Sequence, residues 1–90
     1  MCFICNKVRE IDKFPNADAY LECLSYVQRL VNSKDFRFHR LSCPTYKVYD
    51  ERGFWVDDLL THIIRCTHCG QKFICECDTY NGVGKFARME

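Results

Sequence analysis

The stretch Cys66-Thr67-His68-Cys69-Gly70-Gln71 decides how this chain of 90 residues is expected to fold. A matching stretch, Cys2-Phe3-Ile4-Cys5-Asn6-Lys7, stands near the start of the sequence. In each, two residues separate two cysteines, and the second cysteine is followed by Gly or Asn, which most readily adopt a left-handed backbone. A tight turn of this kind presents two thiolates to one metal ion. Two such turns supply the four ligands of a tetrahedral zinc site, with Zn–S distances of about 2.3 Å.

Size and composition are those of a small folded domain. Ninety residues leave room for one core, so residues 1–90 are expected to form a single zinc-stabilised domain. A domain of this size buries little surface and often relies on a metal or a partner. The aromatic content of 14% argues against disorder, and the net charge of +1 gives no whole-molecule attraction to polyanions.

The eight cysteines are expected to be reduced. Cys2 follows Met1 without the apolar segment of a signal peptide behind it, and no apolar run approaches the length of a membrane span. Paired Cys-x-x-Cys spacing without an export signal favours metal-bound thiols over disulfides. We therefore predict a cytoplasmic protein that does not associate with membranes.

Residues 17–32 carry the clearest helical pattern. Apolar residues recur there at spacings of three and four and form one stripe: Tyr20, Cys23, Leu24, Val27, Leu30 and Val31. Asn16 or Asp18 is placed to cap the start of this helix. Cys23 lies inside the stripe and is expected to be a small buried residue.

The segments that follow predict an antiparallel sheet. Strands are expected at residues 36–41, 45–49, 54–56, 72–78 and 85–89, with a glycine loop at 80–84. Residues 57–65 fit either a short helix capped by Asp57 or a strand at 60–66 that leads into the cysteine turn, and the strand is favoured. The expected fold class is α+β, with one amphipathic helix packed on the sheet and a hairpin joined to the N-terminus.

Geometry ranks the ways in which the cysteines could share a metal. Sulfur ligands of one tetrahedral zinc lie about 3.7 Å apart. A straight strand leaving Cys69 would carry Cys75 about 20 Å away. We therefore predict one structural Zn²⁺ held by Cys2, Cys5, Cys66 and Cys69. A second ion held by some of Cys23, Cys43, Cys75 and Cys77 stays an alternative to the simpler interpretation, in which Cys75 and Cys77 face the core.

Through Cys2-Phe3-Ile4-Cys5-Asn6 and Cys66-Thr67-His68-Cys69-Gly70, the chain resembles the zinc-ribbon class. The resemblance covers about a dozen residues, and the long segment between the two turns departs from a simple ribbon. The class implies a structural zinc and a β-hairpin, but no particular activity.

The sequence contains no recognisable catalytic constellation. Four thiolates leave no position on a zinc ion open to water, and neither the His-x-Glu signature of zinc deaminases nor His-Glu-x-x-His is present. We expect no enzyme but a protein-binding module, such as an inhibitor or immunity-type partner of a larger cytoplasmic protein. The candidate contact residues are Trp55, Tyr80, Asn81 and Gly82, because aromatic residues are enriched at interfaces and the glycine loop projects.

Nucleic acid, either RNA or DNA, is the alternative partner. Phe38 lies among Arg37, His39 and Arg40, a pattern typical of a strand that stacks bases between phosphate contacts. Acidic neighbours such as Asp35 weaken this field, and an amphipathic edge strand has a similar pattern. Protein binding is therefore favoured over nucleic-acid binding.

Overall fold

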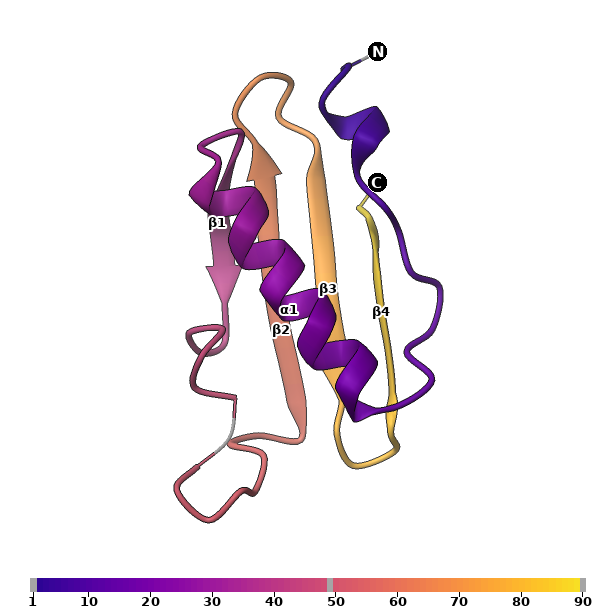
Figure 1. The fold of residues 1–90 in the computed structure, drawn as a ribbon, viewed down its shortest axis with the longest axis vertical. Helices are drawn as coiled ribbons and strands as arrows, with labels where there is room; N and C mark the ends of the chain where they lie inside the picture. Colours follow the sequence, from indigo (N-terminus) through magenta and orange to yellow (C-terminus); the bar gives the residue numbers. More distant parts are fainter. Residues whose placement is uncertain (1, 49, 90) are drawn as a thin grey trace.

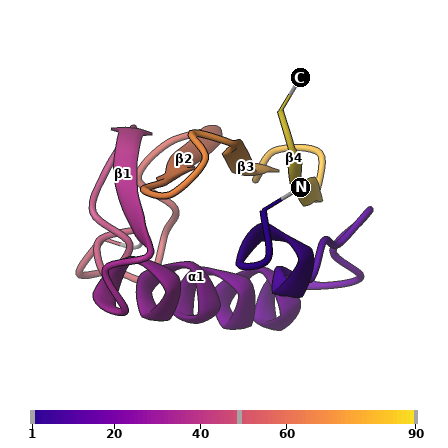
Figure 2. The same cartoon turned by 90° about the horizontal axis from the view of Figure 1, so that it is seen from above.

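The computed structural model describes residues 2–48 and 50–89. Its elements are a 3-10 turn η1 (Cys5–Lys7), helix α1 (Ala17–Asn32) and strands β1 (Phe36–Leu41), β2 (Leu59–Cys66), β3 (Lys72–Asp78) and β4 (Val83–Arg88). The strands form one antiparallel sheet in the order β1-β2-β3-β4. Helix α1 lies across one face of the sheet (Figure 1), and Figure 2 shows no described element over the other face. The predicted α+β fold class is confirmed.

Local interactions define both ends of helix α1. The Asn16 side chain accepts a hydrogen bond of 2.9 Å from the Ala19 N–H, which satisfies one free donor of the first turn. At the other end, Lys34 adopts a positive φ of 71° and the chain turns into β1. The predicted apolar stripe faces the sheet, because Tyr20, Cys23, Leu24 and Val27 are buried.

The sheet buries alternate side chains against α1. On β3 these are Phe73, Cys75 and Cys77, as predicted from the period of two. On β2 they are Leu60, His62, Ile64 and Cys66, which settles the ambiguous segment 57–65 in favour of a strand. The opposite side of the sheet, called here the open face, carries the remaining side chains of each strand.

No strand forms in the described parts of the segments predicted at 45–49 and 54–56, so those two predictions are wrong there; Tyr49 lies outside the described residues. The two segments still pair through two backbone hydrogen bonds, from the Val56 N–H to the Val48 carbonyl at 3.0 Å and from the Asp50 N–H to the Phe54 carbonyl at 2.8 Å. The Asp50 side chain accepts hydrogen bonds from the N–H groups of Arg52 and Phe54, and Gly53 has a φ of 82°. These bonds close a local turn and use the amides that a sheet would need.

The last strand begins earlier than the predicted 85–89, and the loop before it is correspondingly shorter. The Asp78 carboxylate accepts the N–H groups of Tyr80 and Asn81, so the chain reverses within residues 79–82. Gly84 then lies inside β4, opposite Cys77. An added Cβ at Gly84 would lie 2.5 Å from the Glu76 carbonyl oxygen, so only glycine fits this close approach.

The N-terminal segment runs along the outer edge of β4 (Figure 1). Ile11 and Phe86 exchange backbone hydrogen bonds of 2.7 and 2.9 Å, and the Phe14 N–H donates to the Gly84 carbonyl at 3.0 Å. This pairing covers the exposed edge of the sheet. It also carries the first cysteine pair to the tip of the β2–β3 hairpin.

Candidate metal centre

The second cysteine turn joins β2 to β3. The Gly70 N–H donates to the Cys66 carbonyl at 3.0 Å, and Gly70 adopts the predicted left-handed backbone with a φ of 81°. The Cys66 N–H closes the base of the turn on the Gln71 carbonyl at 2.8 Å. This turn therefore presents Cys66 and Cys69 from a hydrogen-bonded loop at the hairpin tip.

The first cysteine turn has a different backbone. The Asn6 N–H donates to the Cys2 carbonyl at 3.2 Å, but Asn6 then continues into η1 and does not adopt the expected positive φ. The Val8 N–H donates to the Cys5 carbonyl and ends this 3-10 turn. The expectation of two matching left-handed turns is thus correct for Gly70 and wrong for Asn6, because the helical turn satisfies the same amides.

The two turns bring four sulfur atoms together. The side-chain ligand atoms of Cys2, Cys5, Cys66 and Cys69 all lie within 4.8 Å of one another. Cys2 Sγ is 3.8 Å from Cys66 Sγ, and Cys5 Sγ is 3.4 Å from Cys69 Sγ, close to the spacing of about 3.7 Å between thiolates on one tetrahedral ion. Cys5 and Cys66 are buried and Cys69 is exposed. These residues could together hold one metal ion.

Electrostatics within the cluster favour a bound cation. The backbone N–H of Cys5 lowers the pKa of Cys2 to about 6, whereas burial and the neighbouring thiols raise the pKa of Cys5. Four thiolates at these distances repel one another, so they cannot all ionise without a compensating positive charge. A divalent cation held by these four residues would supply that charge and displace the remaining protons.

His68 supports the turn without entering the sulfur cluster. Its backbone N–H donates to Cys66 Sγ at 3.4 Å, a bond that orients and stabilises a thiolate. Its ring Nε2 lies 2.9 Å from a carboxylate oxygen of Asp35, in the chain segment before β1. The His68 ring therefore faces Asp35, and only the backbone N–H of this residue contacts a sulfur of the cluster.

The other four cysteines do not form a comparable group. Within residues 2–48 and 50–89, no second set of three or more histidine, cysteine or acidic ligand atoms lies close enough for a shared ion. Cys23 Sγ and Cys75 Sγ are 3.9 Å apart in the core, where the hydrogen bond with Cys23, followed by burial, raises the pKa of Cys75. The structure thus places Cys23, Cys75 and Cys77 as small core residues.

The candidate partner-binding residues lie in two places. Tyr80, Asn81 and Gly82 form the β3–β4 turn at the end of the sheet opposite the cysteines (Figure 1), and Tyr80 is 83% exposed. The Asn81 amide donates to the Asp78 carboxylate at 2.7 Å. Trp55, in contrast, is half-buried, and its ring centroid lies 5.8 Å from that of Tyr20.

Sequence reasoning missed most of the exposed apolar side chains at this end. We call them the distal patch: Phe54, Val56, Leu59, Tyr80 and Val83. The N–H of Thr79 donates to the Asp58 carbonyl at 2.8 Å, which joins the loop before β2 to the β3–β4 turn. Leu59 and Val83 both pair with Asp78 in the sheet. The alternation of β2 and β4 could have indicated Leu59 and Val83.

The candidate nucleic-acid residues are split between the two faces of the sheet. Arg37 pairs with Arg65, and Arg40 with Ile63, on the open face, whereas Phe38 pairs with buried Ile64 on the α1 side. His39 lies at an irregularity in the β1–β2 register. Arg37 and Arg40 thus lie on the face opposite to Phe38, and nucleic-acid binding by these residues stays a prediction.

A row of cations that the sequence did not indicate lies across the open face. Arg37 pairs with Arg65, and Arg65 pairs with Lys72, so three positive side chains lie side by side on β1, β2 and β3. We call these residues the cationic row. Arg37 and Arg65 also line a cavity of about 350 Å³ beside the second cysteine turn. Only the register of the sheet reveals this row.

Comparison with protein families, curated proteins and solved structures gave no match. Within the described residues, no helix has both the length and the apolar character needed to cross a membrane.

Proposed function

We propose that this chain is a non-enzymatic, zinc-stabilised protein-binding module of the cytoplasm. The observation that supports it is the distal patch, whose five apolar side chains are 44–83% exposed. Single exposed apolar residues are ordinary on protein surfaces, but a group of them is typical of a contact site. The sulfur cluster, at the other end of the sheet, would leave this surface free for a partner (Figure 1).

Zinc is the metal that best suits the sulfur cluster. Four cysteine ligands in a tetrahedral set are typical of structural zinc sites, which have no open position for substrate. One zinc ion would join the N-terminal segment to the β2–β3 hairpin. Its role in this proposal is to fix the fold.

The charges around the distal patch indicate what the partner offers. Asp57 and Asp58 precede Leu59, and Asp78 lies between Leu59 and Val83 in the sheet. Hydrogen bonds from Asn81 lower the pKa of Asp78 and keep its carboxylate charged. We infer a protein surface with an apolar pocket and a cationic rim, because complementary charge steers and orients association. An inhibitor that covers such a surface on a larger protein is the narrower form of this proposal.

Substitutions in the distal patch test the proposal. A tagged Leu59→Ser/Tyr80→Ala variant should lose the stoichiometric partner that the unaltered chain retains from its host cell, since exposed aromatic anchors contribute most to such contacts. Tyr46→Ala is the matched control, because Tyr46 is 80% exposed and Tyr80 is 83% exposed, and Tyr46 lines a separate cavity beside α1. Equal retention by the double variant and the control would contradict the proposal.

The cationic row favours nucleic-acid binding as a second candidate function. Among the described residues, no ion pair engages Arg37, Arg65 or Lys72. Like charges paired across strands destabilise a sheet, and phosphates bound along the row would offset that repulsion. The described open face carries no Phe, Tyr or Trp, so binding would be driven by the backbone and tolerant of sequence.

A salt titration distinguishes this second candidate. Binding of a 20-nucleotide RNA or a DNA duplex should weaken steeply with salt, and Arg65→Gln should reduce the slope of log affinity against log salt by about 0.7–0.9. Arg52→Gln, in the connection between β1 and β2, should leave the slope unchanged. The absence of binding at low salt would remove this candidate.

A further inference from the structure

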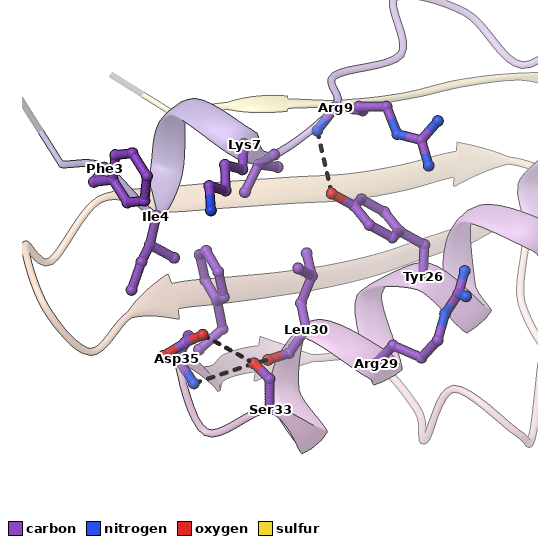
Figure 3. Close-up of a pocket in the computed structure, with 11 residues that line it drawn as sticks. Phe3, Ile4, Lys7, Arg9, Tyr26, Arg29, Leu30, Ser33 and Asp35 are labelled. Carbon is purple, nitrogen blue, oxygen red and sulfur yellow. Dashed lines mark hydrogen bonds between the residues drawn. The ribbon is translucent and has the colours of Figure 1, made fainter.

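A cavity of about 470 Å³ lies between the first cysteine turn and the C-terminal half of α1 (Figure 3). Its volume falls within the range of about 300–1,000 Å³ that is usual for small-molecule sites. Apolar side chains from both walls line it: Phe3, Ile4 and Val8 from the N-terminal segment, Leu30 from α1, and Phe36 from β1.

Three cations stand around this apolar lining. Lys7 Nζ lies 4.3 Å from the centroid of the Phe3 ring. The guanidinium carbons of Arg9 and Arg29 lie 5.8 and 5.9 Å from the centroid of the same ring, that of Tyr26. Figure 3 shows Lys7 over the middle of the cavity, and the guanidinium ends of Arg9 and Arg29 above and below Tyr26, on the far side of that ring from Lys7.

No acid in the described part of the chain forms an ion pair with Lys7, Arg9 or Arg29. Asp35 is the acid that lines the cavity, and its carboxylate lies 2.9 Å from His68 Nε2. The rim therefore keeps a net positive charge above an apolar floor. That combination suits a ligand with one anionic end and one apolar end.

Contacts within the protein hold the two walls of the cavity, the N-terminal segment and α1, in place without a ligand. The Arg9 N–H donates a hydrogen bond of 3.2 Å to the Tyr26 hydroxyl oxygen, which joins the N-terminal segment to α1. Cys2 and Cys5, on the same segment, join it to the hairpin through the sulfur cluster. A preformed cavity loses little conformational entropy on binding.

We propose that this cavity binds a small amphipathic anion, a carboxylate or phosphate carried on an apolar chain or ring. The anionic group lies beside Lys7, within the positive field to which Arg9 and Arg29 add from beyond Tyr26, and the apolar body packs against Ile4, Leu30 and Phe36. The site is independent of the proposed protein-binding function, because the distal patch lies at the opposite end of the sheet (Figure 1).

Methyl NMR of the metal-loaded full chain tests the site with decanoate as the probe. Decanoate should produce saturable shifts at the methyl groups of Ile4 and Leu30 and none at Leu59 or Val83. Decanol lacks the charge and inorganic phosphate lacks the apolar body, so each should bind at least about tenfold more weakly. Equal binding by either probe, equal shifts at Leu59, or no saturable shift would overturn the proposal.

Charge-removing variants separate this rim from general attraction to anions. Lys7→Gln/Arg29→Gln should weaken decanoate binding by up to about tenfold, because it removes the charge contact of Lys7 and part of the positive field at the rim. Both side chains are exposed, so the variant should keep the spectrum of the folded chain. Lys47→Gln/Arg52→Gln removes the same charge from the β1–β2 connection and should leave the affinity unchanged. Equal loss in both variants would show non-specific attraction and overturn the proposal.

Discussion

The guanidinium Nη2 of Arg88 donates a hydrogen bond of 3.0 Å to the backbone carbonyl of Cys5. The same residue bonds Glu10, through its backbone N–H at 3.1 Å and its Nε at 3.5 Å. The end of β4 is thus fastened to the N-terminal segment by one arginine, a few residues from the place where the sulfur cluster fastens that segment to the hairpin. A metal bound by the sulfur cluster would act on the same backbone as this polar contact, and its contribution would be much larger.

We expect Cys66→Ser to unfold the chain. A structural zinc site contributes on the order of 10 kcal/mol at neutral pH, about as much as the whole stability of a small domain. The Arg88 contacts contribute only about 1–3 kcal/mol and cannot replace it. Metal analysis of the unaltered protein should find about one zinc per chain. Thermal unfolding followed by circular dichroism should show a cooperative transition that Cys66→Ser lacks.

Cys43→Ser is the matched control for this prediction. Cys43 is half-buried and lies outside the sulfur cluster, so its substitution should keep both the zinc and the cooperative transition. A metal-free Cys66→Ser protein that unfolds cooperatively near the temperature of the unaltered chain would contradict the structural role of the metal.

The regular elements could be predicted because their signals are local. Helix α1 spans the predicted residues because Asn16 caps it and its apolar stripe is continuous. Strands β1 and β3 also have the predicted bounds. The cysteine pairing followed from ligand distances alone, since no other allocation kept the hairpin straight.

The remaining features depend on contacts that sequence periodicity does not encode. The Asp50 carboxylate accepts hydrogen bonds from backbone N–H groups at Arg52 and Phe54, in a segment whose composition is typical of a strand. The cationic row exists because the register sets Arg65 opposite both Arg37 and Lys72. The cavity lined by the first cysteine turn and α1 requires these two elements to approach each other. The sulfur cluster and the hydrogen bond from Arg9 to the Tyr26 hydroxyl hold the N-terminal segment in that position.

Two glycine substitutions should differ in cost for separate physical reasons. At Gly84 an added Cβ would lie 2.5 Å from the Glu76 carbonyl oxygen and 3.0 Å from the Cys77 Cα, so Gly84→Ala must displace backbone. We expect a loss of about 2–3 kcal/mol, typical of overpacking. At Gly82 no atom lies within 4 Å, and only the positive φ of 70° opposes the substitution, which should cost about 1 kcal/mol.

Urea unfolding of the two glycine variants measures these costs. The Gly84→Ala midpoint should fall clearly below that of Gly82→Ala with an unchanged slope, because the slope reports the surface exposed on unfolding. A Gly84→Ala protein as stable as Gly82→Ala would show that β4 does not lie this close to β3.

The stability of the chain should decrease as the pH falls through the range in which His62 titrates. Its ring is fully buried, and the Nε2–H donates 2.8 Å to the Cys43 carbonyl, while Nδ1 has no described partner. Burial lowers the pKa of His62 below its usual value of about 6.5. Below about pH 6.5 the unfolded chain therefore binds a proton at His62 that the folded chain does not bind. The free energy of unfolding decreases over that range by up to about 1.4 kcal/mol per pH unit.

Comparison with His62→Leu isolates this contribution from the thiols, which also take up protons in acid. Both proteins share the sulfur cluster, so the difference in their free energies of unfolding between pH 7.5 and pH 5.5 reports the histidine. The unaltered chain should show the steeper decline. Parallel profiles would mean that His62 is protonated in the folded protein.

Tyr20→Phe should leave the chain at least as stable as it is now. Tyr20 is 1% exposed, and its hydroxyl oxygen has no hydrogen-bond partner among the described residues. Burial raises the pKa of Tyr20, as expected for a phenol surrounded by apolar groups. A buried hydroxyl without a partner costs about 1–3 kcal/mol in desolvation, so its removal should raise the free energy of unfolding, by about 1 kcal/mol after local relaxation.

Cys75→Ser is the counterpart of this substitution, because it places a new hydroxyl in the same core. Cys75 is fully buried and contacts Cys23 Sγ, a weak acceptor, so the serine hydroxyl would lack a strong partner. We expect a loss of about 1–3 kcal/mol, opposite in sign to the effect of Tyr20→Phe. Urea unfolding of both variants at neutral pH measures the two changes in the free energy of unfolding, which should be opposite in sign. If Tyr20→Phe is destabilising instead, the hydroxyl has a partner, and an ordered water between Tyr20 and the core thiols is the group to seek.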